Sequence, residues 1–203
     1  MVNFATKERW CELMSCAQLP ECLHIYEKLV TAYSEPQRHY HTLNHIDDML
    51  GEFFLAKEQI DGDAIAIELA IWFHDAVYKP MSKTNEYDSA KWAKEFLGGY
   101  GRSDLAQEVF DLVMATKDHH PINHNAKWLL DIDLGILGSP PERFELFEQQ
   151  VRKEYRWVPN IIYKSKRKEI LKQFLQRPEI YQTEYFRERY EMQARINIEG
   201  SID

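Results

Sequence analysis

A histidine and an aspartate stand side by side in the stretch Ile71–Tyr78, IWFHDAVY, at the end of an apolar helical run. Successive side chains on a helix are turned by about 100°, so His74 and Asp75 cannot face the same way. Both can nevertheless reach one point at the end of the helix, where a bound cation is the usual occupant. The alternative is that His74 is a core histidine bonded to a neighbour and that Asp75 caps the following loop.

Two other segments of the chain carry further potential ligands. One is Arg38–Leu50 upstream, with the sequence RHYHTLNHIDDML, and the other is Trp128–Gly138 downstream, with the sequence WLLDIDLGILG. Together with the central pair, their histidines and aspartates give the ordered pattern H…HD…D. Its members are His45, His74, Asp75 and Asp133.

Five phrases follow one another along the chain, namely YHTLNHIDDML, FHDAVY, NEYDSA, ATKDHH and DIDLGILG. Several phrases in order are far more specific than the HD dipeptide alone. The chain resembles the HD superfamily of metal-dependent phosphohydrolases and, more narrowly, one predicted-phosphohydrolase branch of it. The resemblance is strong over residues 38–138 and weaker over the C-terminal third. It implies one HD-type domain over residues 1–203, with a motif core at 38–138 and a helical extension at 139–203.

The resemblance also implies that His45, His74, Asp75 and Asp133 hold the metal. The first of these has a rival, because His41 lies four residues earlier and shares its face if the helix begins early. We prefer His45 because Ile46 and the residues that follow give the apolar pattern that packs a helix against its neighbour.

The last ligand has a rival as well. Asp131 and Asp133 are two residues apart and therefore face nearly opposite sides of a helix, so only one of them can join the cluster. We choose Asp133 because its Asp-Leu context resembles the final aspartate of the superfamily pattern. Asp131 remains the alternative.

Two imidazoles and two carboxylates form a mixed nitrogen and oxygen shell. Such a shell suits Mn²⁺, Fe²⁺, Co²⁺, Ni²⁺ or Zn²⁺ better than Mg²⁺, so we expect one divalent transition metal ion. The loop Asp118–His124 contains three histidines, His119, His120 and His124. A second ion is therefore an alternative, and in the superfamily dinuclear sites also support phosphodiesterases and di-iron oxygenases.

A phosphorylated substrate requires positive charge beyond the metal. The basic candidates lie in or beside the segments that carry the expected metal ligands, which must come together if the ligands do. Three other side chains are expected near them. The expected substrate contacts are Arg38, Lys79, Lys83, His41, Tyr78 and His119.

The expected catalytic residues are Asp75 and an acidic partner. Many relatives place an acidic residue directly after the HD dipeptide, but here Ala76–Tyr78 occupies that position. We take Glu86, in the NEYDSA phrase, as the substitute acid or base. The alternative is that Glu86 is a first-turn carboxylate favoured by the helix dipole.

Apolar residues recur at helical spacing in nearly every window, which predicts an all-α bundle of about nine or ten helices. The residues 139–142, Ser-Pro-Pro-Glu, have the pattern of a capping box with serine as N-cap and the first proline at N1. The expected helices span about residues 4–18, 20–33, 42–60, 64–77, 85–98, 103–117, the LLDIDLGIL segment, 140–157, 161–175 and 178–198.

Length and charge exclude several classes of protein. The 203 residues suit one domain, and a net charge of −8 disfavours a nucleic-acid backbone as the main partner. The chain has no run of about 18 apolar residues, so we expect no membrane partner. Three cysteines, an odd number, suit a reducing compartment, and we expect a cytoplasmic protein.

The resemblance, together with these patterns, implies a metal-dependent phosphohydrolase that acts on a nucleotide or another small phosphorylated metabolite. A homo-oligomer is compatible with this prediction. The alternatives are a dinuclear phosphodiesterase or oxygenase and a nucleotide-binding regulatory protein without turnover.

Overall fold

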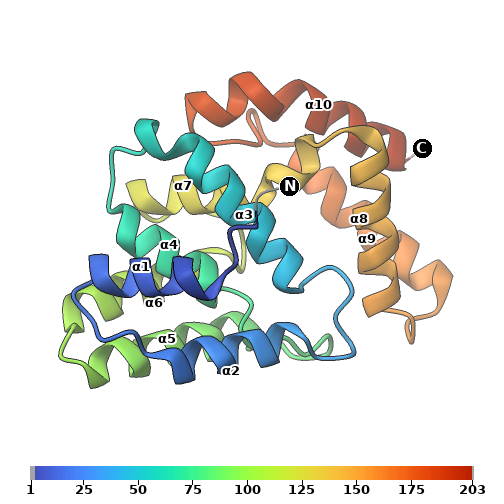
Figure 1. Cartoon of the computed structure of the whole chain (residues 1–203). Helices are drawn as coiled ribbons and strands as arrows, with labels where there is room; N and C mark the ends of the chain where they lie inside the picture. The colour runs from blue at the N-terminus through green and yellow to red at the C-terminus, as the bar shows by residue number, and fades with distance from the viewer. Residues whose placement is uncertain (1–2, 203) are drawn as a thin grey trace. The chain divides into compact units, whose positions relative to one another are not determined.

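The computed structural model describes residues 3–202, which fold into ten α-helices and two 3₁₀ helices with no strand among them (Figure 1). The elements in chain order are α1 (Lys7–Cys16), α2 (Leu23–Tyr33), α3 (Leu43–Ala56), η1 (Lys57–Gln59), α4 (Ala64–Phe73), α5 (Asn85–Gly99), α6 (Ser103–Ala115), α7 (His124–Asp133), η2 (Leu134–Gly138), α8 (Pro141–Glu154), α9 (Asn160–Leu175) and α10 (Glu184–Ile202). The predicted all-α fold is confirmed. Within the described range, no helix has both the length and the apolar composition that crossing a membrane requires.

The chain forms two compact units, one up to Leu130 and one from Asp131 onward. The boundary falls inside α7. In the first unit α4 is the central helix and packs against α1, α3, α5 and α6. Its sequence is apolar on almost every face, and every residue from Ala66 to Phe73 is buried.

The start of α4 agrees with the sequence prediction, but its predicted end at Val77 is wrong. Asp63 caps the helix by accepting hydrogen bonds from the backbone N–H groups of Ile65 and Ala66, both at 3.0 Å. The α-helix ends at Phe73, four residues before the expected end. The chain tightens there, because the N–H of Ala76 bonds to the carbonyl of Phe73 at 3.0 Å, and distant side chains bind other carbonyls at this end of the helix.

Two side chains from the segment around the end of α2 make these contacts. The Tyr33 hydroxyl donates to the carbonyl of Trp72 at 3.0 Å. Arg38 donates to the carbonyls of Asp75 and Ala76 at 2.7 and 3.1 Å. Helix ends leave carbonyls without intrahelical partners, so these contacts stabilise the point at which α4 stops.

A buried ion pair ties α1 to α4. Glu68 is the one charged residue within the sequence of α4, and its side chain is 3% exposed. Arg9 donates to both of its carboxylate oxygens, through Nε at 2.6 Å and through Nη2. The forked guanidinium matches a carboxylate well, which permits this charge in an apolar core.

In the second unit η2 lies directly against α10. A Cβ added to Gly138 would be 2.5 Å from Cβ and 2.8 Å from the carbonyl oxygen of Tyr190. The Asn197 amide donates to the carbonyls of Leu137 and Ser139, both at 2.8 Å. Only glycine permits this close approach, and the amide bonds hold it in place.

The predicted capping box before α8 is wrong. Pro140 is the N-cap and Pro141 begins the helix, one residue later than expected. Ser139 instead ends η2, and its buried hydroxyl has no hydrogen-bond partner. The carbonyl of Ser139 accepts a hydrogen bond from Asn197, 58 residues away. A non-local contact therefore holds the backbone just before α8.

Candidate metal centre

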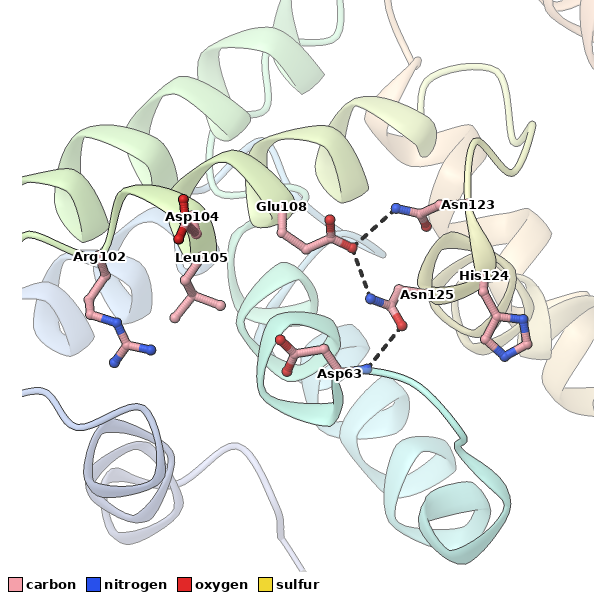
Figure 2. A pocket seen from close by; sticks show the side chains of 8 residues that line it. All are labelled: Asp63, Arg102, Asp104, Leu105, Glu108, Asn123, His124 and Asn125. Carbon is pink, nitrogen blue, oxygen red and sulfur yellow. Dashed lines mark hydrogen bonds between the residues drawn. The ribbon is translucent and has the colours of Figure 1, made fainter.

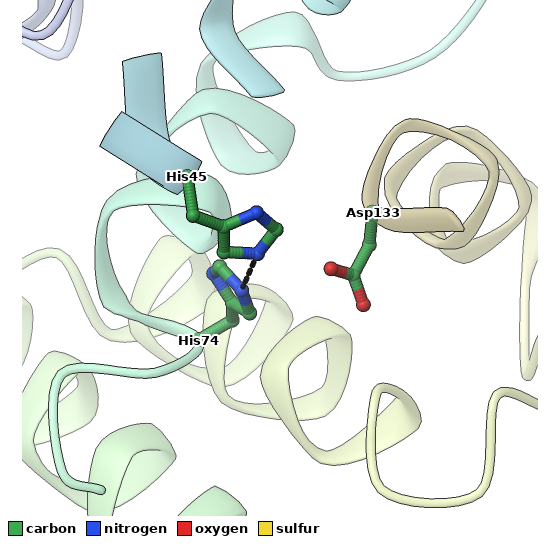
Figure 3. Close-up of side chains that lie close together, drawn as sticks. All are labelled: His45, His74 and Asp133. Carbon is green, nitrogen blue, oxygen red and sulfur yellow. Dashed lines mark hydrogen bonds between the residues drawn. The ribbon is translucent and has the colours of Figure 1, made fainter. Parts of the chain in front are cut away.

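Two histidines of the first unit meet at the centre of the predicted site. His45 lies in the first turn of α3, after the N-cap Thr42, and His74 follows directly after α4. Both side chains are buried, and their Nε2 atoms are 3.2 Å apart (Figure 3). Two nitrogens that converge in this way can share a proton or a cation.

The other ring nitrogen of His74 fixes the state of the imidazole. His74 Nδ1 is 2.9 Å from the carbonyl oxygen of Ile71, which can only accept, so Nδ1 carries the proton. In neutral His74 the Nε2 atom then holds a lone pair, and this atom is 3.1 Å from Oδ2 of Asp75. A backbone carbonyl that orients an imidazole in this way is typical of metal-ligating histidines.

Asp75 lies at the edge of the pair, with a side chain that is 18% exposed. Burial by itself raises the pKa of this carboxyl, but the positive charge of the His74, His41 and His45 imidazoles in their protonated form outweighs burial and holds the pKa below its ordinary value. The carboxylate is therefore ionised at neutral pH. His45 and Asp75 thus both lie next to Nε2 of His74, and imidazoles and carboxylates are residue types that often bind cations.

His41 and Tyr78 border this group. Their rings are stacked, with centroids 4.4 Å apart and an interplanar angle of 27°. His41 Nε2 is 4.0 Å from Oδ2 of Asp75, and the His41 side chain is 22% exposed. Of the two histidines weighed as ligands, His45 faces His74 from the buried side, and His41 lies nearer the surface.

Arg38 does not occupy the place expected of a phosphate contact. Its side chain is fully buried and donates to the carbonyls of His41, Asp75 and Ala76 and to the carboxylate of Glu35. These contacts direct its charge toward the protein backbone. The geometry favours a role in shaping the site.

Two residues that the sequence analysis did not identify hydrogen-bond to the backbone of the loop after His74 and Asp75. The side-chain amide of Asn85 pairs with both the N–H and the carbonyl of Lys79, at 3.1 and 3.0 Å. Ser89 Oγ accepts from the N–H of Val77 at 2.9 Å. Asn85 and Ser89 are four residues apart in the NEYDSA phrase, and that spacing on one face of α5 was the available signal.

The same phrase and loop contain three other predicted residues. Lys79 and Lys83 are exposed, while Glu86 is half-buried in the first turn of α5. Their positions leave both lysines accessible to an anionic ligand. The predicted roles of the three remain predictions.

The three histidines of residues 118–124 have different surroundings. His119 is half-buried and adopts a left-handed backbone conformation with φ of 48°. His120 Nδ1 lies 3.0 Å from the carbonyl of Asp118. His124 is exposed and hydrogen-bonds through Nε2 to the carboxylate of Asp61.

His124 instead lines a separate cavity of about 610 Å³ at the N-terminal end of α4 (Figure 2). Glu108 accepts there from the amides of Asn123 and Asn125, at 3.1 and 2.9 Å. His74 follows the other end of α4, about 15 Å away along a helix of ten residues. The cavity is therefore distinct from the His45–His74 pair.

The second unit contains both aspartates weighed as the last ligand. Asp131 is fully buried and accepts three hydrogen bonds of 2.7 Å, from the N–H of Gln182 and from the N–H and hydroxyl of Thr183. Burial raises its pKa to about 6, although these hydrogen bonds oppose the rise. Asp133 is half-buried at the end of α7 and is also drawn in Figure 3. The oxygens of Asp131 thus hold the segment before α10, a contact that the local sequence does not indicate.

The chain matches no protein-family model, no curated protein and no solved structure. Function must therefore be argued from the site itself.

Proposed function

We propose that the protein is a metal-dependent phosphohydrolase that cleaves a phosphate ester or pyrophosphate bond in a nucleotide or another small phosphorylated metabolite. We further propose one divalent transition metal ion, Mn²⁺, Fe²⁺, Co²⁺, Ni²⁺ or Zn²⁺, as its cofactor. The proposed ligands are His45, His74, Asp75 and Asp133.

The observation that carries this proposal is the approach of His45 Nε2 and Asp75 Oδ2 to Nε2 of His74. The two distances from His74 Nε2 are 3.2 Å to His45 and 3.1 Å to Asp75. Because the Ile71 carbonyl holds the proton on Nδ1, Nε2 of His74 faces both groups as an electron donor. A divalent cation would satisfy all three atoms at once, in place of the single proton that can bridge the histidines.

Asp133 is proposed as the fourth ligand on two grounds. Asp131 already accepts three hydrogen bonds from the segment that precedes α10, so its oxygens are used within the second unit. Along α7, Asp133 follows Leu129 and Leu130 by four and three residues, so it shares their helix face, and both leucines are buried. Its place in the ordered H…HD…D pattern supports the same choice.

A bound divalent ion would lower the pKa of a water molecule and polarise a phosphoryl oxygen. Asp75 contributes a carboxylate that is ionised and partly accessible, with a side chain 18% exposed. The stacked His41 and Tyr78 form one edge of the site next to this carboxylate. The exposed Lys79 and Lys83 follow Tyr78 in the chain and can neutralise the charge of a phosphate.

A substrate screen tests the proposal. Protein loaded with Mn²⁺, Co²⁺ or Ni²⁺ is assayed against nucleoside mono-, di- and triphosphates, cyclic nucleotides, guanosine polyphosphates and sugar phosphates. We expect turnover of one class, and we expect Asp75→Ala to abolish it while helical content by circular dichroism stays unchanged. His124→Ala is the matched control, because His124 pairs with Asp61 and should leave turnover intact.

Two results would contradict the proposal. Metal-loaded protein that turns over none of these compounds would leave a metal-binding or oxygenase role. Undiminished turnover in Asp75→Ala would show that the chemistry takes place elsewhere.

A further inference from the structure

We infer that Arg38 is a positioning residue that holds the two ligand-bearing segments of the first unit together, and that it does not contact the substrate phosphate. The segments are residues 38–45, which lead into α3, and residues 74–78, which follow α4. This inference rests on the proposed function, because it assigns Arg38 to the same metal centre.

The guanidinium donors of Arg38 bridge the two segments. Nη1 donates to the carbonyl of His41 at 3.1 Å and to the carbonyl of Asp75 at 2.7 Å. Nη2 donates to the carbonyl of Ala76 at 3.1 Å, and Nε to the carboxylate of Glu35 at 3.1 Å. One planar group therefore fixes the backbone on both sides of the His45–His74 pair.

Aromatic rings restrict the same group. The guanidinium carbon lies 5.1 Å from the ring centroid of Tyr33 and 5.4 Å from that of Tyr78. Tyr78 in turn stacks on His41, so the rings continue from Arg38 to the edge of the site. With a side chain that is 0% exposed, Arg38 is held in one orientation and is hidden from a substrate in solvent.

Lysine cannot replace this arrangement. Its ammonium group donates from a single point, whereas the guanidinium presents five N–H donors in a fixed plane. Arg38→Lys would keep the charge but could not reach the carbonyls of His41, Asp75 and Ala76 in the same geometry. Groups that orient metal ligands from outside the coordination shell typically affect metal affinity tenfold to a hundredfold.

The test compares Arg38→Lys and Arg38→Met with Arg9→Lys. Arg9 is the matched control because it is also a largely buried arginine of the first unit, with a side chain 16% exposed, but it pairs with Glu68. Affinity for Co²⁺ alone is measured by calorimetry and by the visible spectrum of the bound ion. Amide hydrogen exchange is measured on the metal-free proteins.

We expect Arg38→Lys to weaken Co²⁺ binding by about tenfold to a hundredfold and Arg38→Met to weaken it at least as much. Exchange should become faster at residues 39–42 and 74–78 in both Arg38 variants. Arg9→Lys should keep the wild-type Co²⁺ affinity and show no change in those two segments.

Wild-type Co²⁺ affinity in the Arg38 variants would overturn the inference and leave the proposed function standing. Unchanged exchange in both segments would overturn it as well, whether or not metal binds. A wild-type protein that binds no Co²⁺ would overturn the proposed function itself and, with it, the role of Arg38 at a metal centre.

Discussion

The Nε2 atoms of His45 and His74 lie 3.2 Å apart although 29 residues separate the two histidines in the chain. Two neutral imidazoles can satisfy this contact only if one nitrogen carries a proton and the other does not. The carbonyl of Ile71 already fixes the proton of His74 on Nδ1. In this contact His45 Nε2 is therefore the donor and His74 Nε2 the acceptor.

The first prediction concerns these two histidines. His45→Ala and His74→Ala should each remove most of the bound transition metal, because each deletes a nitrogen of the buried pair. Elemental analysis of the purified variants measures this loss. His124→Ala serves as the control, since its imidazole is bonded to Asp61.

A second ion would give a different result. If the wild-type protein contains two ions and both His119→Ala and His124→Ala halve the metal content, the mononuclear site is wrong. The dinuclear alternative would then be favoured, and oxygen-dependent turnover with bound iron would distinguish an oxygenase from a phosphodiesterase.

The second prediction separates the two aspartates. Asp131→Ala leaves the N–H groups of Gln182 and Thr183 without their acceptor, so it should destabilise the protein by about 1–3 kcal/mol or more while metal is retained. Asp133→Ala should lose metal, because it removes a proposed ligand. Metal loss in the Asp131 variant with full metal in the Asp133 variant would reverse the assignment.

The helices could be predicted from the sequence because apolar spacing is a local signal, and most of their positions agree with the structure. The end of α4 could not be predicted in the same way. Apolar residues continue to Val77, but the contacts of Tyr33 and Arg38 with the carbonyls after Ile71 stop the helix at Phe73. The deciding partners are 37 to 39 residues away in the chain.

The positions of the proposed ligands and of the expected substrate contacts were unequally predictable for a related reason. Residue type and order indicated that His45 and His74 belong to one site, and their Nε2 atoms lie 3.2 Å apart. Arg38 was expected to bind phosphate from its charge and its neighbours in sequence. The burial and the direction of its side chain depend on the carbonyls of Asp75 and Ala76 and on the ring of Tyr33, and the two carbonyls are far from Arg38 in the sequence.

The third prediction concerns the close approach of η2 and α10 in the second unit. Gly138→Ala should destabilise the protein by about 1–3 kcal/mol, because the new Cβ would meet the backbone of Tyr190 at 2.8 Å. Gly200→Ala in α10 is the control, since its Cβ would meet nothing within 4 Å and should be neutral or slightly stabilising. Urea unfolding followed by circular dichroism measures both. Equal stability of the two variants would contradict the close packing.

The fourth prediction concerns the buried pair of Arg9 and Glu68. Burial raises the pKa of Glu68 above its ordinary value of 4.5, and Arg9 opposes that rise. Arg9→Met removes the opposing charge, so the pKa of Glu68 should rise further. Breaking a buried pair in this way should cost about 3–5 kcal/mol at neutral pH.

The sign of the pH dependence follows from proton binding. Above pH 4.5 the unfolded chain loses the proton of Glu68, while the folded Arg9→Met variant keeps it up to the raised pKa. The folded state then binds more protons, so its stability falls as the pH rises through this window. We therefore expect Arg9→Met to be less destabilised near pH 5 than near pH 7.5, as measured by urea unfolding at both pH values. The double variant Arg9→Met with Glu68→Leu should lose this difference and regain stability, because no buried charge remains; persistence of the difference would show that another group causes it.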